Sequence, residues 1–209
     1  MCIQIDMRTV ALVSQKGGSG KSSLAVHLAV CAARRRKTVA VVDLDPQASV
    51  LGWAKRRGLD DITVIGARSQ EVPSILARAR EQKADVIILD TPGRADITAA
   101  RVMSLADVVL VPCRVGIYDV EASVETAAEV KRSGVKHAAF VLNAIPSRGT
   151  RHEETRAALE QLLPVAPVGL HHLVAFSDAL NDGRSVEELE PKGKAAAEIR
   201  ALYAWFAKL

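Results

Sequence analysis

Aromatic residues are scarce in this chain: Phe, Trp and Tyr together make up 3% of its 209 residues. Because 49% of the residues are hydrophobic, the chain can still bury a sizeable core, built from Ala, Val, Leu and Ile. Such an interior is typical of helices packed on a sheet rich in valine and isoleucine. The length suits one domain, and we expect a single domain over residues 1–209.

Cysteine is rarer still, since only Cys2, Cys31 and Cys113 occur and none has metal-ligand spacing. An odd, widely separated set excludes a disulfide scaffold and favours a reducing compartment, with Cys31 and Cys113 as buried thiols. Asp6 and Arg8 precede any apolar run, so we expect that the first residues are not a signal peptide.

Long apolar runs are absent as well, because no stretch approaches the roughly 20 residues of a membrane-spanning helix. The charge is nearly balanced, with 28 Lys and Arg against 24 Asp and Glu. This small basic surplus allows a polyanionic partner without requiring one. We therefore expect a cytoplasmic protein.

Short runs rich in Val and Ile alternate with longer helical patterns from end to end. The patterns predict strands at 9–14, 38–42, 62–65, 86–89, 108–111, 138–142 and 165–168, and helices at 21–35, 49–57, 72–82, 120–132, 152–162, 173–181 and 193–208. Alternation of this kind favours parallel strands joined by right-handed crossovers. We expect a three-layer, doubly wound α/β fold with a mostly parallel sheet.

A segment rich in glycine and lysine joins the first strand to the first helix, with the sequence Gln15-Lys16-Gly17-Gly18-Ser19-Gly20-Lys21-Ser22-Ser23. Glycines let backbone N–H groups approach phosphate oxygens, and the helix directs its positive end at the same anion. Lys21 would reach the β- and γ-phosphates, and the Ser22 hydroxyl would bind Mg²⁺. The alternative is a glycine-rich turn with incidental lysines, which the strand–loop–helix order disfavours.

This phosphate loop departs from the general pattern at two places. Gln15 stands where glycine is usual, and a second lysine, Lys16, lies inside the loop with little to pair with unless it meets phosphate. The stretch from Lys16 to Ser22 resembles the deviant Walker A motif of the ParA/MinD family of ATPases. Asp43-Leu44-Asp45-Pro46-Gln47 is similar to the second signature of ParA partition ATPases. The resemblance runs along nearly the whole chain, is closest to the small, ParF-like type, and implies a P-loop NTPase fold.

Two carboxylates, Asp43 and Asp45, follow the strand predicted at 38–42. The carboxyl end of a parallel strand opens beside the phosphate loop, so both could serve Mg²⁺ and the attacking water; the alternative is helix capping. The resemblance implies that Asp45 positions the water and that Asp43 supports the metal and the loop.

Asp90 ends the strand predicted at 86–89 and precedes Thr91-Pro92-Gly93. This is a Walker B arrangement, which predicts a carboxylate held near Mg²⁺. The alternative is an ordinary turn that begins with Asp. Gly93 could let the segment move with the γ-phosphate.

Asn143 ends the strand predicted at 138–142. The resemblance implies that it reads adenine, and a turn-forming asparagine is an equal alternative. No Asn-Lys-x-Asp string is present to select guanine, so ATP is favoured over GTP. The predicted nucleotide contacts are residues 16–23 and Asn143.

The family counterpart of Lys16 reaches across a dimer to the partner's ATP. The resemblance therefore implies an ATP-sandwich homodimer, undone by hydrolysis, in which Lys16, Lys21 and Asp45 are catalytic. Asp119 either joins this interface or caps a helix.

The resemblance further implies ATP-dependent, non-specific DNA binding on the nucleoid and the segregation of plasmid or chromosome DNA. A ParB-like centromere-binding or adaptor protein would stimulate a slow ATPase. The basic residues available are Arg34-Arg35-Arg36-Lys37, Arg56-Arg57, and the C-terminal set Arg184, Lys192, Lys194 and Arg200, which resembles the family's DNA-facing region. His171-His172-Leu173-Val174 stands where relatives often carry arginine.

Other functions remain open. A MinD-like membrane-associated regulator would use the apolar face of the last helix, formed by Ile199, Leu202, Phe206 and Leu209. We expect that helix to pack on the core instead, since its polar face is poor in Lys and Arg, and we expect no membrane partner. A positioning ATPase for a protein cargo is a further alternative. A synthetase or metal-cluster carrier would want an extra domain or a Cys-x-x-Cys pair, which this sequence lacks.

Overall fold

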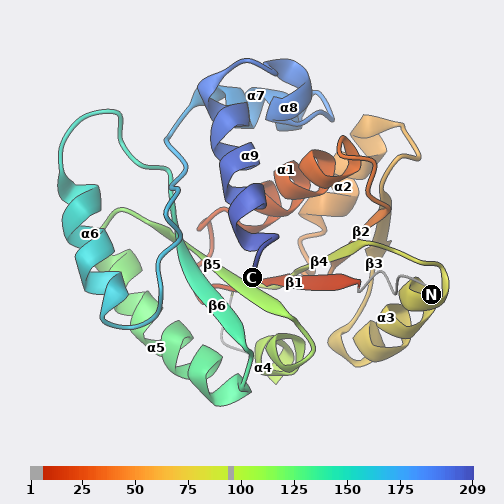
Figure 1. The fold of residues 1–209 in the computed structure, drawn as a ribbon, viewed down its shortest axis with the longest axis horizontal. Coiled ribbons are helices and arrows are strands. Elements are labelled where there is room, and N and C mark those ends of the chain that lie inside the picture. The colour runs from red at the N-terminus through yellow and green to blue at the C-terminus, as the bar shows by residue number, and fades with distance from the viewer. Residues whose placement is uncertain (1–6, 94–96) are drawn as a thin grey trace.

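A computed structural model describes residues 7–93 and 97–209 of the chain; Cys2 and Asp6 lie outside the described residues. Its centre is a parallel sheet in the order β3-β2-β4-β1-β5-β6 (Figure 1). The strands are β1 (Arg8–Leu12), β2 (Val39–Asp43), β3 (Thr63–Gly66), β4 (Val86–Asp90), β5 (Val108–Arg114) and β6 (His137–Asn143). Every pair of neighbouring strands is parallel, which confirms the predicted fold class.

Helices cover both faces of this sheet (Figure 1). One face carries α1 (Lys21–Ala33), α2 (Ser49–Arg57), α7 (Val174–Asn181), α8 (Val186–Leu189) and α9 (Lys194–Phe206). The other carries α3 (Val72–Glu81), preceded by the 3₁₀ turn η1 (Ser69–Glu71), and α4 (Ile97–Ser104), α5 (Ile117–Ser133) and α6 (Arg151–Glu160).

Alternating side chains of the strands supply the two cores. On β1, Val10 and Leu12 pack beneath α1 and α9, whereas Ala11 faces α4 and α5 with Val109 of the neighbouring strand. All five residues of β2 and of β4 are buried, because both strands are central and covered on both faces.

Most element boundaries agree with the sequence patterns. Helix α2 has the predicted bounds, and α5 ends at Ser133 with Gly134 as its C-cap, whose left-handed φ of 73° favours glycine. The prediction of a strand at 165–168 is wrong: within the described residues this segment forms one isolated bridge, between Val165 and Phe140. Pro164 and Pro167 have no N–H to donate, so a ladder cannot continue there.

The last helix packs on the core, as expected. Ile199, Leu202 and Phe206 of α9 are at most 1% exposed and belong to the core beneath α1. No helix in the described part of the chain combines the length and the apolar character needed to cross a membrane. Cys31 and Cys113 are buried free thiols, which confirms their expected placement.

Candidate functional site

The phosphate loop joins the end of β1 to the first residue of α1. Gly18 and Gly20 have left-handed φ angles of 75° and 99°, and a Cβ on Gly20 would collide with the side-chain amide of Asn143. No described side chain caps the N-terminus of α1, and the buried Ser19 hydroxyl has no hydrogen-bond partner among the described residues. The positive end of the helix therefore faces a loop with free donors, which is the arrangement that binds phosphate.

Lys21 is the cation of this loop. It is 5% exposed, and its Nζ lies 3.5 Å from the carbonyl oxygen of Ser14. Burial lowers the pKa of Lys21, while the charges of Asp90 and Asp45 raise it. A buried ammonium with one long hydrogen bond is poorly satisfied on its own, so an incoming phosphate oxygen would complete its surroundings.

Asp90 is the last residue of β4 and lies close to Lys21 and Ser22 of the phosphate loop. It is fully buried, and neither carboxylate oxygen has a hydrogen-bond partner among the described residues. The pKa of Asp90 is raised to about 7, mainly because the carboxyl group is buried. The nearby Ser22 hydroxyl acts in the opposite direction, although no hydrogen bond of good geometry joins the two groups. Buried oxygens without donors are costly and signal a missing partner.

Those oxygens and the Ser22 hydroxyl fit a magnesium ion. Mg²⁺ prefers oxygen ligands and retains several waters, so one hydroxyl and one carboxylate beside the phosphates suffice. Gly93 closes the same region, because a Cβ there would come within 3.3 Å of Lys21 Nζ and 3.1 Å of Gly17 Cα.

Asp43 caps a helix. Its Oδ2 accepts hydrogen bonds from the backbone N–H groups of Val50 (3.0 Å) and Leu51 (3.1 Å), and its Oδ1 accepts one from Asp45 (3.2 Å). Burial raises the pKa of Asp43 and these donors lower it. The alternative of helix capping is thus correct for Asp43, which also holds the following loop; its contact with metal stays a prediction.

Asp45 is half-buried at the same edge of the sheet. Its Oδ1 accepts a hydrogen bond from the N–H of Gln47 at 2.9 Å, and its carbonyl accepts one from Ala48 at 2.8 Å. In the parallel register Asp43 lies beside Asp90, so β2 and β4 bring the three carboxylates to one edge. Asp45 keeps one carboxylate oxygen without a hydrogen bond in the described structure, which leaves it able to orient a water.

Asn143 reaches the phosphate loop from the end of β6. Its Nδ2 donates to the carbonyl oxygen of Ser19 at 2.7 Å, and its Oδ1 accepts from the N–H of Ala144 at 2.9 Å. Beside it lies a cavity of about 230 Å³, whose lining includes Gly20, Ser23, Leu24, Asn143, His171 and Phe176. This cavity adjoins the loop and mixes apolar with polar walls, so it can receive a nucleotide base; the adenine contact of Asn143 stays a prediction.

Lys16 does not lack a partner, and that expectation is wrong. Its Nζ lies 2.8 Å from Asp119 Oδ2 of the same chain, in the first turn of α5, where Gly116 rather than Asp119 is the N-cap residue. Sequence reasoning did not pair Lys16 with Asp119 of the same chain, because only the fold brings the start of α5 to the loop.

Sequence reasoning also missed the contact of His171 with Glu198 and the buried His27, both at the cavity. His171 Nδ1 lies 2.6 Å from Glu198 Oε1 of α9, which accounts for one member of the His171-His172 pair. His27 is 1% exposed, and burial lowers its pKa to about 3. It lines the cavity on the same face of α1 as Ser23 and Leu24, four and three residues before it, a spacing that could have revealed it. No cluster of three or more metal-binding side chains occurs in the described residues.

Comparison with known proteins agrees with this geometry. The family model of the CobQ/CobB/MinD/ParA nucleotide binding domain matches residues 10–186. The chain belongs to this family. It is 32% identical to the maintenance of carboxysome distribution protein A of Gloeobacter kilaueensis, over 94% of this chain and 90% of that one. It is 28% identical to the chromosome-partitioning ATPase Soj of Thermus thermophilus, over 57% of this chain and 59% of Soj.

Solved structures confirm the fold. The septum site-determining protein MinD of Pyrococcus horikoshii, complexed with Mg-ADP, superposes with a TM-score of 0.79 over 97% of this chain and 96% of that one, at 18% identity. The resemblance to ParA/MinD ATPases and the P-loop NTPase fold are therefore confirmed.

Proposed function

We propose that this ParA/MinD-family protein is an ATPase that binds ATP with Mg²⁺ and hydrolyses it slowly. The observation that carries this is the fully buried Asp90, whose oxygens have no described donor and which lies beside the phosphate loop. A magnesium ion would neutralise phosphate charge there. The MinD relative solved with Mg-ADP supports the choice of ligands.

The residues of the loop divide the work. Backbone N–H groups of residues 16–23 hold the phosphates, and Lys21 neutralises charge on the β- and γ-phosphates. Ser22 and Asp90 hold the metal, with Asp43 fixing the loop that follows β2. Asp45 orients the attacking water, and Asn143 and the adjoining cavity receive the adenine.

The working form is a homodimer with two ATP molecules at its interface. Lys16 leaves Asp119 and neutralises charge on the partner's γ-phosphate, which couples dimerisation to ATP. The dimer binds DNA without sequence specificity, on the nucleoid in the cytoplasm, and a ParB-like centromere-binding or adaptor protein stimulates turnover. The cargo is plasmid or chromosome DNA, as the relationship to a chromosome-partitioning ATPase supports.

A second candidate has its own support. The 32% identical relative is named for the distribution of carboxysomes, so the same switch could position a cargo other than DNA. Nucleotide binding would be common to both candidates, and they differ in the cargo and in the partner that stimulates hydrolysis.

Light scattering of the purified chain with ATP, with ADP and without nucleotide tests the switch. Of these three conditions, we expect a dimer only with Mg-ATP. We also expect slow phosphate release, which Asp45→Ala should abolish without preventing dimerisation. A monomer under all three conditions would reject the sandwich dimer. Phosphate release at the wild-type rate from Asp45→Ala would reject the role of Asp45.

A further inference from the structure

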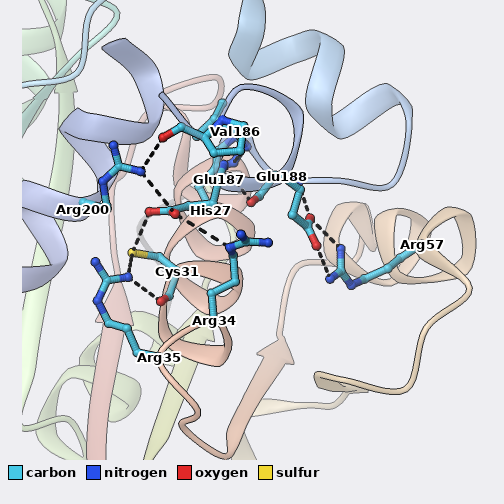
Figure 2. A network of polar contacts seen from close by, with 11 residues as sticks. His27, Cys31, Arg34, Arg35, Arg57, Val186, Glu187, Glu188 and Arg200 are labelled. Carbon is cyan, nitrogen blue, oxygen red and sulfur yellow. Dashed lines mark hydrogen bonds and ion pairs between the residues drawn. The ribbon is translucent and has the colours of Figure 1, made fainter. Parts of the chain in front are cut away.

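Two basic segments that are distant in the sequence meet at one surface of the molecule. The four residues from Arg34 to Lys37 follow the end of α1, and Arg200 lies on α9, which packs along α1. Arg200 Nη1 lies 3.4 Å from Glu187 Oε2, and Arg34 Nε lies 4.0 Å from the same oxygen. Figure 2 shows Arg34, Arg35 and Arg200 gathered around Glu187 and Cys31. We call Arg34, Arg35, Arg36, Lys37 and Arg200 the α1–α9 basic cluster.

Positive charge is in excess within this cluster. Ion pairs to described residues come from Glu187, which is 5% exposed, and from Asp85, which lies 3.0 Å from Lys37. Five cations against two carboxylates leave an excess of three positive charges. Arg35 packs over the ring of Tyr203 at 5.0 Å and forms no ion pair with the described residues. Like charges held this closely favour an external anion.

The helix dipole does not account for the whole arrangement. Cations at the end of α1 complement its negative end, but Arg200 comes from the middle of α9, where its Nη1 donates to the carbonyl oxygen of Pro191 at 2.8 Å and lies 3.4 Å from Glu187 Oε2. The side chains of Arg34 and Arg200 remain 49% and 35% exposed, so the guanidinium groups are open to a ligand. By contrast, Arg57 of the Arg56-Arg57 pair is 4% exposed and bound to Asp61 and Glu188, which removes it from the residues available to DNA.

We propose that the α1–α9 basic cluster binds the backbone phosphates of DNA, and that ATP strengthens this binding by joining two such clusters in one dimer. The proposal rests on the proposed ATP-dependent dimer. The thirteen residues of α1 separate the cluster from the phosphate loop by about 20 Å. A dimer joined at the phosphate loops carries one cluster toward each outer end. Each chain therefore binds weakly, and the dimer gains affinity because the second contact is intramolecular.

The surroundings of the cluster favour DNA over a membrane surface. Membrane-surface helices combine basic residues with exposed apolar side chains. The large exposed hydrophobic residues of the described structure all lie outside α1 and α9: Leu59, Ile117, Tyr118, Val124 and Val174. The cluster thus offers charge without an apolar face to insert.

Charge-removing variants test the proposal. In Arg34→Gln/Arg36→Gln, Arg200 still pairs with Glu187, so the buried carboxylate keeps a partner. The matched control is Lys131→Gln/Arg132→Gln, which removes two exposed charges from the end of α5, on the other face of the sheet. Circular dichroism and light scattering with ATP establish that each variant is folded and dimerises. Arg200→Gln provides a second, independent variant.

The readout is the affinity for an unrelated, fluorescently labelled DNA duplex at several salt concentrations, with ATP and without nucleotide. We expect the cluster variant to lose about tenfold or more in affinity, and its salt dependence to fall by about two counterions, while the control retains both. The nucleotide-free protein should bind weakly and be impaired by the same variant. Wild-type affinity in both cluster variants would overturn the cluster and leave the proposed function intact. A wild-type dimer that fails to bind DNA would reject DNA binding altogether.

Discussion

Lys16 Nζ lies 2.8 Å from Asp119 Oδ2, and this ion pair joins the phosphate loop to the first turn of α5 within one chain. The two side chains are 39% and 13% exposed, so the pair is partly solvated and contributes about 0.5 to 1 kcal/mol. Since the proposed dimer needs Lys16 at the partner's ATP, the pair opposes dimerisation by about that amount in each chain.

Removing this competition should favour the dimer. In Asp119→Asn, Lys16 loses its partner at the same side-chain volume, so we expect half-maximal dimerisation at an ATP concentration about two- to fivefold lower. Glu121→Gln, an exposed substitution on the same helix, is the control. Light scattering during an ATP titration measures the effect. Weaker dimerisation would instead show that Asp119 itself supports the interface.

Lys16→Gln should separate ATP binding from dimerisation. Lys21 and the backbone of the loop remain, so equilibrium binding of a fluorescent ATP analogue should change little. Dimerisation and phosphate release should both be lost, because no other cation would reach the partner's γ-phosphate. Normal values for both would overturn the sandwich arrangement.

Asp90 should destabilise the protein that holds no nucleotide. The pKa of its carboxyl is raised to about 7, so folding favours the protonated form, and stability is lost as pH rises from about 4 to 7. Asp90→Asn removes this penalty, and we expect a gain of about 2 to 4 kcal/mol in the free energy of unfolding at pH 8, together with loss of hydrolysis. Urea unfolding without nucleotide measures the gain.

Asp43→Ala is the contrasting variant, because Asp43 caps α2. Loss of the cap should lower the free energy of unfolding by about 1 kcal/mol. If Asp90→Asn lowers the free energy of unfolding as well, the buried carboxylate stabilises the nucleotide-free protein, and the expected penalty is wrong.

The sequence predicted those parts of the site that depend on chain-local patterns. The loop between β1 and α1 and the carboxylates after β2 and β4 follow from apolar runs that end in polar residues, and parallel strands bring such ends to one edge. Contacts between distant segments carry no local pattern. Lys16 with Asp119, His171 with Glu198, and Arg200 with Glu187 became visible only once the helices were packed.

Two short helices were not predicted from the sequence for a related reason. Helix α8 has four residues, too few to show an apolar period, yet its capping box at Ser185 and Glu188 is written in the sequence. The sequence patterns also did not predict helix α4, which has eight residues. It begins at Ile97, directly after residues 94–96, which lie outside the described part of the chain.

His27 should make the protein sensitive to acid. Its Nδ1 accepts a hydrogen bond from the N–H of Val186 at 3.4 Å, so the neutral ring connects α1 to the start of α8. Because burial lowers the pKa of His27 from 6.5 to about 3, its contribution to stability is complete above pH 6.5 and is lost as pH falls toward 3. The loss amounts to about 2 kcal/mol between pH 6.5 and 5.

The variant His27→Asn tests this contribution, because a side-chain amide can accept the same hydrogen bond and does not titrate. We expect urea unfolding to give wild-type protein a free energy that falls between pH 7 and 5, and the variant a value that falls by about 2 kcal/mol less over that range. His152→Asn, a substitution of the partly exposed histidine on α6, should retain the wild-type dependence. Equal slopes for His27→Asn and wild type would mean that another group carries the acid sensitivity.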